Sequence, residues 1–352
     1  MTPRTIVAGL HLRWDGVWQR PQQLLSRIAR SIPVVVVEEP FPAHEDRDAV
    51  IHDGPVTIVR PLRRRGWAPP FVDDAAIAAA RGFAGDGPHG VWLSTPMLDA
   101  LADAFAARPL IYDVMDELAQ FDFAPDGIAA RDRALVERAD IVFTGGRSLY
   151  AARAAAGPKV HCEPSGVELE RFAADVTPHP LTAQLVGPVF GYVGVIDERI
   201  DVALIEALAD GVPGGHVILV GPIVKIDAAL LPRRANVHFT GGVPYDGLPS
   251  WLAGFDVALL PFARNRATEF ISPTKTLEYF AAGKPVISTP IADVVAEFGD
   301  TVYLAQDATG FVAAACEALH PSPVRLARGR EHARARTWDA IAHRMLDVIT
   351  QR

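Results

Sequence analysis

A short segment around residues 272–285 contains the residue types that bind an anion and a diol. Its apolar spacing predicts a helix over Thr274–Ala282. Ser272 is a good N-cap and Pro273 suits the first helical position. The free N–H groups at a helix start attract anions, and Lys275 adds a positive charge in the first turn. The segment therefore predicts a phosphate site.

Glu278 follows Lys275 on the same face of this predicted helix and lies one turn from Thr274. A carboxylate there can accept two hydrogen bonds from a ribose diol. A lysine in the first turn opposes the helix dipole, and a bound diphosphate would remove that conflict. Phosphate at the helix tip with ribose one turn deeper is the arrangement that a nucleoside diphosphate needs. An ordinary capped helix with a surface Lys–Glu pair remains the alternative.

The elements around this segment alternate between short β-rich runs and Ala- and Leu-rich helical stretches, which indicates βα units and parallel sheets. In the first half we expect strands at Thr5–Leu10, Pro33–Glu38, Val56–Arg60, Gly90–Ser94, Leu110–Asp113, Ile141–Thr144 and Lys159–Cys162. The helices expected there are Gln19–Arg30, Asp73–Gly82, Pro96–Ala107, Ile128–Ala139 and Ser148–Ala156.

The same alternation restarts in the second half of the chain. Strands are expected at Val189–Val193, Gly215–Val220, Val237–Thr240, Asp256–Leu260 and Pro285–Ser288. Besides the segment above, helices are expected at Val202–Ala209, Leu248–Ala253, Thr309–Leu319 and Val324–Thr350.

The Pro-containing stretch Ala173–Pro188 has few periodic apolar positions and is interpreted as the connection between two domains. A length of 352 residues agrees with two domains. We expect a first domain over 1–178, a second over 179–335, and a terminal helix over 336–352 that returns to the first. Both domains should be doubly wound α/β folds that face a cleft, with functional residues just after strands.

Composition excludes several classes of protein. A net charge of −8 and a pI near 5.8 argue against a broad nucleic-acid footprint. We expect neither a signal peptide nor a membrane span, because no apolar run is long enough. The two distant cysteines favour a reduced, cytoplasmic setting. The histidines lack metal-ligand spacing, so neither a metal nor another cofactor is expected.

The segment Ser-Pro-x-Lys-x-x-Glu-Tyr at 272–279, followed by Gly-x-Pro-Val, resembles the donor-binding motif of GT-B glycosyltransferases, especially glycosyltransferase family 4. The resemblance implies a nucleoside diphosphate sugar as substrate, UDP-linked among the expectations, and Glu278 on the donor ribose. It assigns Ser272 and Thr274 to donor binding and Lys275 to catalysis. The family's other Glu, which contacts the transferred sugar, would fall at Phe270.

Further matches extend along the chain. Gly191–Arg199 resembles the opening strand and loop of the donor domain, which implies donor contacts at Gly194 and Val195 and a cationic, catalytic role for Arg199. The segment 237–249 resembles the part whose backbone meets the nucleobase, with Gly241 and Val243 at the donor. Residues 164–172 resemble the end of the first domain, and Trp338-Asp339 the start of the returning helix.

Two loops of the first half carry the acceptor candidates. The loop after the first strand contains Trp14 and Gly16 and leads to Arg20 at a helix start. Asp113 and Asp116 follow the fifth strand, where carboxylates can orient acceptor hydroxyls, and we place Asp116 among the catalytic residues. A loop packed by tryptophans, and carboxylates that cap helices or form ion pairs, remain the alternatives.

A basic, aromatic loop spans Arg63-Arg64-Arg65-Gly66-Trp67 and Pro69-Pro70-Phe71. We expect it to be solvated, and contact with anionic lipid or a lipid-linked acceptor is the alternative. Such contact would put the protein at the inner face of a membrane.

Taken with the resemblance, these residues predict a glycosyltransferase that moves a sugar from a nucleoside diphosphate sugar to a carbohydrate or lipid-linked acceptor, with retention of configuration. Polysaccharide or cell-envelope synthesis is the expected setting, and the protein is expected to be a monomer or a dimer. Two alternatives stay open: a GT-B epimerase of nucleotide sugars, and an inactive glycosyltransferase-like partner subunit.

Overall fold

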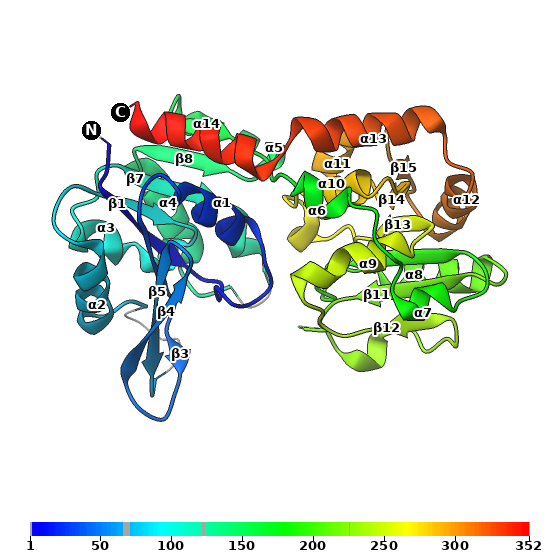
Figure 1. Cartoon of the computed structure of the whole chain (residues 1–352), viewed down its shortest axis with the longest axis horizontal. Helices are drawn as coiled ribbons and strands as arrows, with labels where there is room; N and C mark the ends of the chain where they lie inside the picture. Colours follow the sequence, from blue (N-terminus) through cyan, green and yellow to red (C-terminus); the bar gives the residue numbers. More distant parts are fainter. Residues whose placement is uncertain (1, 66–70, 122–123, 225, 352) are drawn as a thin grey trace. The chain divides into compact units, whose positions relative to one another are not determined.

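The computed structural model describes residues 2–65, 71–121, 124–224 and 226–351, and the chain divides into two compact units. The first unit comprises Met1–Pro164 with Trp338–Arg352, and the second comprises Ser165–Thr337 (Figure 1). Each unit has its own hydrophobic core.

The first unit is a mainly parallel sheet with helices packed against it. Its strands are β1 (Thr5–Leu10), β2 (Val34–Glu38), β3 (Phe41–Pro42), β4 (Arg47–Asp53), β5 (Val56–Arg63), β6 (His89–Leu93), β7 (Leu110–Val114), β8 (Ile141–Thr144) and β9 (Val160–Cys162). Its helices are α1 (Arg20–Ile28), α2 (Asp74–Ala84), α3 (Ala100–Ala104), α4 (Ile128–Arg138), α5 (Arg147–Arg153) and α14 (Trp338–Thr350). Short 3₁₀ turns cover Pro96–Leu98, Leu118–Gln120 and Ala154–Ala156.

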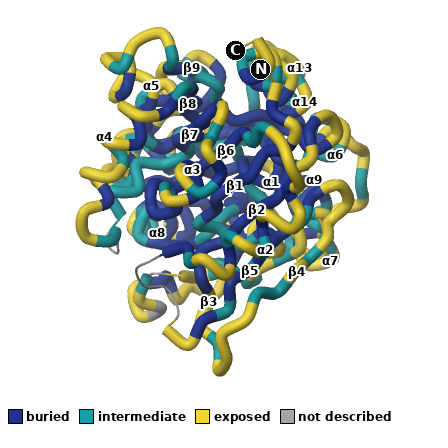
Figure 2. Tube along the Cα trace, turned by 90° about the vertical axis from the view of Figure 1, so that its left-hand side faces the viewer, coloured by how far each residue is buried: buried dark blue, intermediate teal, exposed yellow. Residues whose placement is uncertain are grey.

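The strand order in this sheet is β3-β5-β2-β1-β6-β7-β8-β9, with β4 antiparallel to β5. The inner strands are continuous apolar runs such as Val34–Val37, as expected for strands that are covered on both faces. The hairpin of β4 and β5, by contrast, has an exposed outer strand, and Figure 2 shows the change from buried inner strands to the exposed β3–β4 stretch.

Helix α14 closes the core of the first unit. Trp338, Ile341 and Met345 are buried in one apolar cluster with Leu24 and Ile28 of α1. The last helix of the chain therefore completes the core that the first residues begin (Figure 1).

The second unit has a six-stranded sheet with the strand order β12-β11-β10-β13-β14-β15. This is the order of the doubly wound dinucleotide-binding fold. Its strands are β10 (Val189–Val193), β11 (His216–Val220), β12 (Val237–Phe239), β13 (Val257–Leu260), β14 (Val286–Ser288) and β15 (Tyr303–Leu304), and all pairs are parallel. Its helices are α6 (Leu169–Phe172), α7 (Pro180–Ala183), α8 (Val202–Gly211), α9 (Leu248–Ala253), α10 (Lys275–Ala281), α11 (Ala292–Phe298), α12 (Ala308–Ala318) and α13 (Pro323–Ala335). Its 3₁₀ turns cover Ala228–Leu230, Tyr245–Gly247 and Arg266–Thr268.

The chain passes from one unit to the other at Pro164–Ser165, before the stretch Ala173–Pro188 that the sequence suggested as the connection. That stretch belongs to the second unit because it packs there. The ring of His179 stacks on Trp251 at 3.7 Å, its backbone N–H bonds to Ser250, and Thr182 is buried.

The single helix expected over Val324–Thr350 is two helices, α13 and α14, separated at Arg336–Thr337. The break has a tertiary cause. Val167 donates its N–H to the Arg336 carbonyl at 3.0 Å and forms a parallel bridge with Thr337, which takes these residues out of the helix. In the described residues, no helix is both long and apolar enough to cross a membrane.

Candidate functional site

The second unit has a topological switch point between β10 and β13. From β10 the chain moves to β11 and β12 on one side, then returns to β13 on the other. Ligands of open α/β sheets bind at the carboxyl ends of the strands at such a point. The two loops that begin there, residues 194–201 after β10 and residues 261–274 after β13, together with the first turn of α10, therefore form the donor-side candidate site.

Backbone contacts join these two loops to each other. Ile200 forms an antiparallel bridge with Phe262, and Ala263 donates its N–H to the Arg199 carbonyl at 2.8 Å. The Asn265 side-chain amide donates to the Glu198 carbonyl at 3.0 Å. The loops therefore act as one structural element, so residues on either loop keep a fixed position relative to the other.

Arg199, the cation predicted in the first loop, forms an ion pair with Asp197. The Nη2 atom lies 2.7 Å from Oδ2, and Nε lies 3.0 Å from Oδ1. Asp197 is buried, whereas about a quarter of the Arg199 side chain is exposed. The carboxylate thus orients the guanidinium at the sheet edge and balances part of its charge.

Helix α10 begins at Lys275, later than the sequence predicted. Thr274 is the N-cap, its backbone is already in the right-handed helical region, and its side chain makes no capping bond. Ser272 and Pro273 therefore precede the helix rather than opening it. The first turn is tightened instead, because Thr276 N–H bonds to the Pro273 carbonyl and Leu277 N–H to the Thr274 carbonyl, both at 3.1 Å.

Lys275 and Glu278 contact each other on the first turn of α10. Lys275 Nζ lies 2.9 Å from Glu278 Oε2 and donates a hydrogen bond to Oε1 at 3.2 Å. Oε2 is the nearer oxygen, but the ammonium group does not point at it with hydrogen-bond geometry. Glu278 is buried, whereas the Lys275 side chain is about one-fifth exposed. One carboxylate oxygen is therefore left without a hydrogen-bond donor among the described residues.

Burial raises the pKa of the Glu278 carboxyl, and the nearby Lys275 ammonium opposes that rise. The charge of Glu168 pushes the pKa further upward. A carboxylate in this environment gains from any ligand that donates hydrogen bonds to it.

Tyr245 and Glu168 also belong to this site, although sequence reasoning assigned no role to either. The Tyr245 hydroxyl bonds to Glu168, and burial together with the charge of Glu278 raises the tyrosine pKa. The ring centroid of Tyr245 lies 6.0 Å from Lys275 Nζ and 5.0 Å from the Arg171 guanidinium carbon. Both residues fall in segments that resembled the family, which was the only available signal.

Tyr279 fixes α10 against the sheet. Its side chain is fully buried, and the backbone N–H of Val193, at the end of β10, donates to its hydroxyl at 2.8 Å. This bond ties the helix that carries Lys275 and Glu278 to the strand that precedes Arg199.

The ends of β10, β11 and β12 approach one another at glycines. A Cβ atom at Gly221 would lie 1.8 Å from the Gly194 carbonyl oxygen, and Gly221 forms an antiparallel bridge with Gly241. Val195, at the same sheet edge, accepts a hydrogen bond from the Tyr192 hydroxyl at 3.0 Å, and Val243 packs against the core. Four residues that the sequence assigned to binding of the nucleotide-sugar donor therefore follow the carboxyl ends of these strands: Gly194, Val195, Gly241 and Val243.

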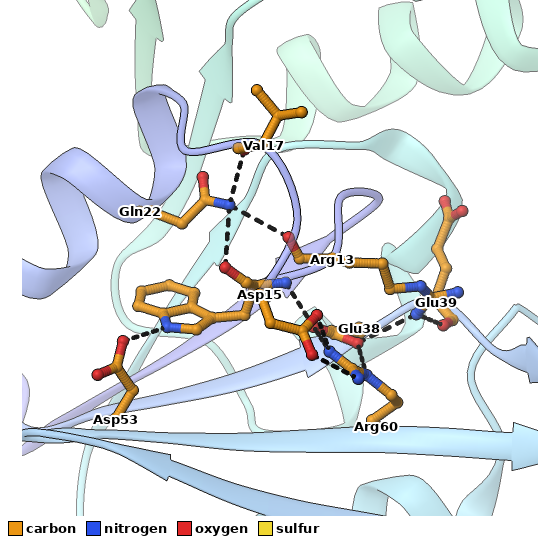
Figure 3. Close-up of polar contacts among 9 residues, drawn as sticks. Arg13, Asp15, Val17, Gln22, Glu38, Glu39, Asp53 and Arg60 are labelled. Atoms are coloured by element: carbon orange, nitrogen blue, oxygen red, sulfur yellow. Dashed lines mark hydrogen bonds and ion pairs between the residues drawn. The ribbon is translucent and has the colours of Figure 1, made fainter. Parts of the chain in front are cut away.

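In the first unit, the switch point lies between β1 and β6, and the loop after β1 carries the acceptor candidates. Figure 3 shows how this loop is held. Buried Glu38 accepts hydrogen bonds from the Trp14 backbone N–H at 2.7 Å, from Arg13 at 3.1 Å and from Arg60 at 2.5 Å. The Trp14 indole N–H donates to Asp53 at 2.7 Å.

The Gln22 side-chain amide donates to three carbonyls of the same loop, those of Arg13, Trp14 and Val17. Figure 3 labels Gln22 with Arg13 and Val17. Gly16 is exposed, and its N–H closes a turn on the Arg13 carbonyl at 3.1 Å. The loop is therefore ordered by the protein itself, with Trp14 buried inside it and Gly16 at its surface.

Arg20 and Asp113, both predicted at the acceptor, bind each other. Arg20 Nη2 lies 2.7 Å from Asp113 Oδ1, its Nε lies 3.0 Å from the same oxygen, and both side chains are almost fully buried. Arg20 Nη1 also donates to the Glu163 carbonyl at 2.7 Å. Asp116 is half-buried in the loop after β7 and also interacts within the protein.

The basic loop is partly described. Arg63 is buried and forms ion pairs with Asp48 at 2.6 Å and with Asp73 at 2.5 Å, so this residue is not a solvated cation. The predicted positions Gly66, Trp67, Pro69 and Pro70 lie outside the described residues. Within the described ranges, no group of three or more His, Cys, Asp or Glu side chains is placed to hold a metal ion.

Two Rossmann-like units, with the anion- and diol-binding residue types at the switch point of the second, define the GT-B class. Residues 187–320 match the family described as Glycosyl transferases group 1. The chain therefore has the GT-B fold, and its second unit is similar to the group 1 glycosyl transferases over the matched residues.

Among curated proteins, the chain is similar to TuaH of Bacillus subtilis (strain 168), which is assigned as a glycosyltransferase of teichuronic acid biosynthesis. Identity is 26% over 238 residues, and the match covers 62% of this chain and 59% of TuaH. The chain thus spans less than two thirds of the length of that relative.

Solved structures show the same fold. Sucrose-phosphate synthase from Thermosynechococcus elongatus superimposes with a TM-score of 0.75 at 16% identity, covering 99% of this chain and 98% of that one. HepE from Anabaena, in complex with UDP and glucose, gives a TM-score of 0.70 at 16% identity, with coverages of 99% and 100%.

Proposed function

We propose that the protein is a retaining glycosyltransferase that transfers a sugar from a nucleoside diphosphate sugar to a hydroxyl acceptor. One observation carries the proposal: Lys275 and the buried Glu278 stand on the first turn of α10 at the switch point, and one Glu278 oxygen lacks a donor. A ribose diol supplies two hydrogen-bond donors for Glu278, and a diphosphate can replace Glu278 as the anionic partner of Lys275.

In this proposal Lys275 turns from Glu278 to the diphosphate when the donor binds. Arg199, already oriented by Asp197, contributes a second positive charge. The two cations stabilise the charge that develops on the leaving diphosphate, which is electrostatic rather than acid catalysis. Gly194, Val195, Ser272 and Thr274 line the donor, and the segment with Gly241 and Val243 meets the base.

The proposed reaction breaks the bond from the anomeric carbon to the diphosphate oxygen, and the electron pair leaves with the diphosphate. The acceptor oxygen forms its bond on the same face, and its proton passes to a phosphate oxygen. No protein base is needed on this route, and two cations serve where a metal ion would otherwise neutralise the diphosphate. UDP is the first nucleotide to test, because the structurally similar HepE is described with UDP.

The acceptor is proposed to bind on the first unit, beside the loop with Trp14 and Gly16 and the β7 end with Asp113 and Asp116. Arg20 acts there through its ion pair with Asp113 rather than by direct contact. Because TuaH is assigned to teichuronic acid biosynthesis, a cell-envelope polysaccharide or its lipid-linked precursor, made at the inner face of the membrane, is the proposed acceptor class.

The Lys275→Ala variant tests the proposal. We expect loss of turnover of about 100-fold or more, by analogy with the removal of one group that stabilises developing charge. The fold should be intact, as measured by circular dichroism. Lys159→Ala is the matched control. Lys159 lies in the first unit, just before strand β9, and donates hydrogen bonds to the Glu137 and Ala139 carbonyls. Turnover by Lys275→Ala at the wild-type rate would refute the assignment.

A further inference from the structure

Glu198, in the loop after β10, has a carboxylate that accepts no hydrogen bond from the described residues. Both oxygens, Oε1 and Oε2, are buried, and neither has a hydrogen-bond partner among the described residues. An ionised carboxylate is a pure acceptor with about four lone-pair positions. To bury such a group without donors is costly, so this position calls for an explanation.

The polar groups closest in sequence are already engaged elsewhere. Arg199 directs its Nε and Nη2 atoms, and its backbone N–H, to Asp197. The side-chain amide of Asn265, which reaches across from the neighbouring loop, donates to the backbone carbonyl of Glu198 and not to its carboxylate. The loop is thus fixed on both sides of Glu198, while the carboxylate itself receives no donor from either neighbour.

The position of Glu198 just after strand β10 indicates which ligand can donate hydrogen bonds to its carboxylate. The residue lies in the loop between β10 and α8, at the switch point where open α/β sheets take their ligands. Its backbone is held by the loop that leads to α10 and so to Lys275 and Glu278.

We infer that Glu198 is a specificity-determining residue that accepts hydrogen bonds from hydroxyl groups of the transferred sugar. The inference rests on the proposed function, because it needs a nucleoside diphosphate sugar at this switch point. A sugar brings several hydroxyl donors and no charge, so it can satisfy a buried acceptor that the protein leaves open. Sites of this kind discriminate strongly, because an analogue that lacks the hydroxyl leaves the buried group unpaired.

The test compares the Glu198→Gln variant with wild type in titrations of UDP and of UDP-glucose, UDP-galactose and UDP-N-acetylglucosamine. All titrations contain EDTA, so a metal bridge to the diphosphate makes no contribution. We expect the affinity of the variant for UDP to stay within about twofold of wild type. Its affinity for the sugar nucleotide that wild type prefers should fall about tenfold or more, which is the usual effect of losing a charged hydrogen bond.

Glu317→Gln, the same substitution at an exposed position on α12, is the matched control and should change neither affinity. The melting temperature of the ligand-free Glu198→Gln protein is the second readout. It should equal or exceed that of wild type, since no described protein partner is lost. A lower melting temperature would show that the carboxylate serves the fold, and would overturn the inference.

The outcomes separate the two proposals. Equal effects of Glu198→Gln on UDP and on the sugar nucleotide, or no effect on either, overturn the role of Glu198 and leave the proposed function standing. A wild-type protein that binds none of these nucleotides, nor ADP-, GDP-, CDP- and dTDP-linked sugars in parallel titrations, overturns the proposed function itself.

Discussion

Glu278 is buried on the first turn of α10, close to Lys275 and within the field of Glu168. Burial raises the pKa of its carboxyl group, and the charge of Glu168 raises it further. In the proposed function this group binds the ligand at some cost to the stability of the fold, so we expect its effects on binding and on stability to be opposite in sign.

The Glu278→Gln variant should show both effects. Because the folded state raises the pKa above its ordinary 4.5, the stability due to this group is present below that pH and is lost as the pH rises through the raised pKa. The melting temperature of the variant, minus that of wild type, should therefore increase from about pH 4 to about pH 8. The affinity for UDP should fall about tenfold or more.

Differential scanning fluorimetry over this pH range and calorimetric titration with UDP measure the two effects. Glu317→Gln, the same substitution at an exposed position, is the control for both measurements. A flat difference for Glu278→Gln would contradict the assignment of its raised pKa.

Arg199 has both a structural and a proposed catalytic role, which a pair of variants can separate. Arg199→Ala leaves the buried Asp197 carboxylate without its partner, so we expect a loss of about 1–3 kcal/mol in the free energy of unfolding. The double variant Asp197→Asn with Arg199→Ala removes that charge and should regain most of the stability. Turnover should stay low in both proteins, and recovery of turnover in the double variant would exclude Arg199 from the diphosphate site.

At the scale of elements, the glycine contact between the ends of β10 and β11 makes a quantitative prediction. An alanine Cβ at Gly221 meets the Gly194 carbonyl, and Gly221 also has a positive φ of 153°. We expect Gly221→Ala to destabilise the protein by about 2 kcal/mol or more in urea denaturation. Gly241→Ala is the control, since its φ of 74° is strained but its Cβ meets no atom within 4 Å, and should cost about 1 kcal/mol. Equal losses would show that the close approach is easily relieved.

Much of the element order could be predicted from the sequence because the inner strands are apolar runs that alternate with helical stretches. The β3–β4 stretch escaped prediction because its side chains are mostly exposed, so no buried face produces a pattern. Helix α11 and the short strand β15 were also missed. The break between α13 and α14 has no glycine or proline to announce it, since its cause is the pairing of Val167 with Thr337.

In the candidate site, too, contacts between residues close in sequence could be predicted, and contacts between distant segments could not. The spacing of Lys275 and Glu278 along one helix predicts that they face each other, because that contact is local. The partners of Tyr245, Arg20 and Glu198 depend on how distant segments pack, and spacing along the chain has no information about them. Sequence reasoning therefore did not predict that Arg20 forms an ion pair with Asp113.

At the scale of the whole molecule, the last helix belongs to the core of the first unit, so a change near the C-terminus should destabilise the N-terminal strands. Trp338 is buried against α1, and Trp338→Ala should cost about 3–5 kcal/mol. Hydrogen exchange should accelerate in β1 and β2 much more than in β10 and β11. His343→Ala, at an exposed position of the same helix, should leave both regions protected. Equal acceleration in both units would contradict separate cores.

The bridge between Val167 and Thr337 lies where the chain arrives in the second unit and where it departs. The second unit is thus inserted into the sequence of the first unit, and a backbone bridge joins its two ends. In the proposed function the second unit binds the nucleotide sugar, so chimaeras cut at Ser165 and Thr337 should take their nucleotide-sugar preference from the protein that supplies the second unit.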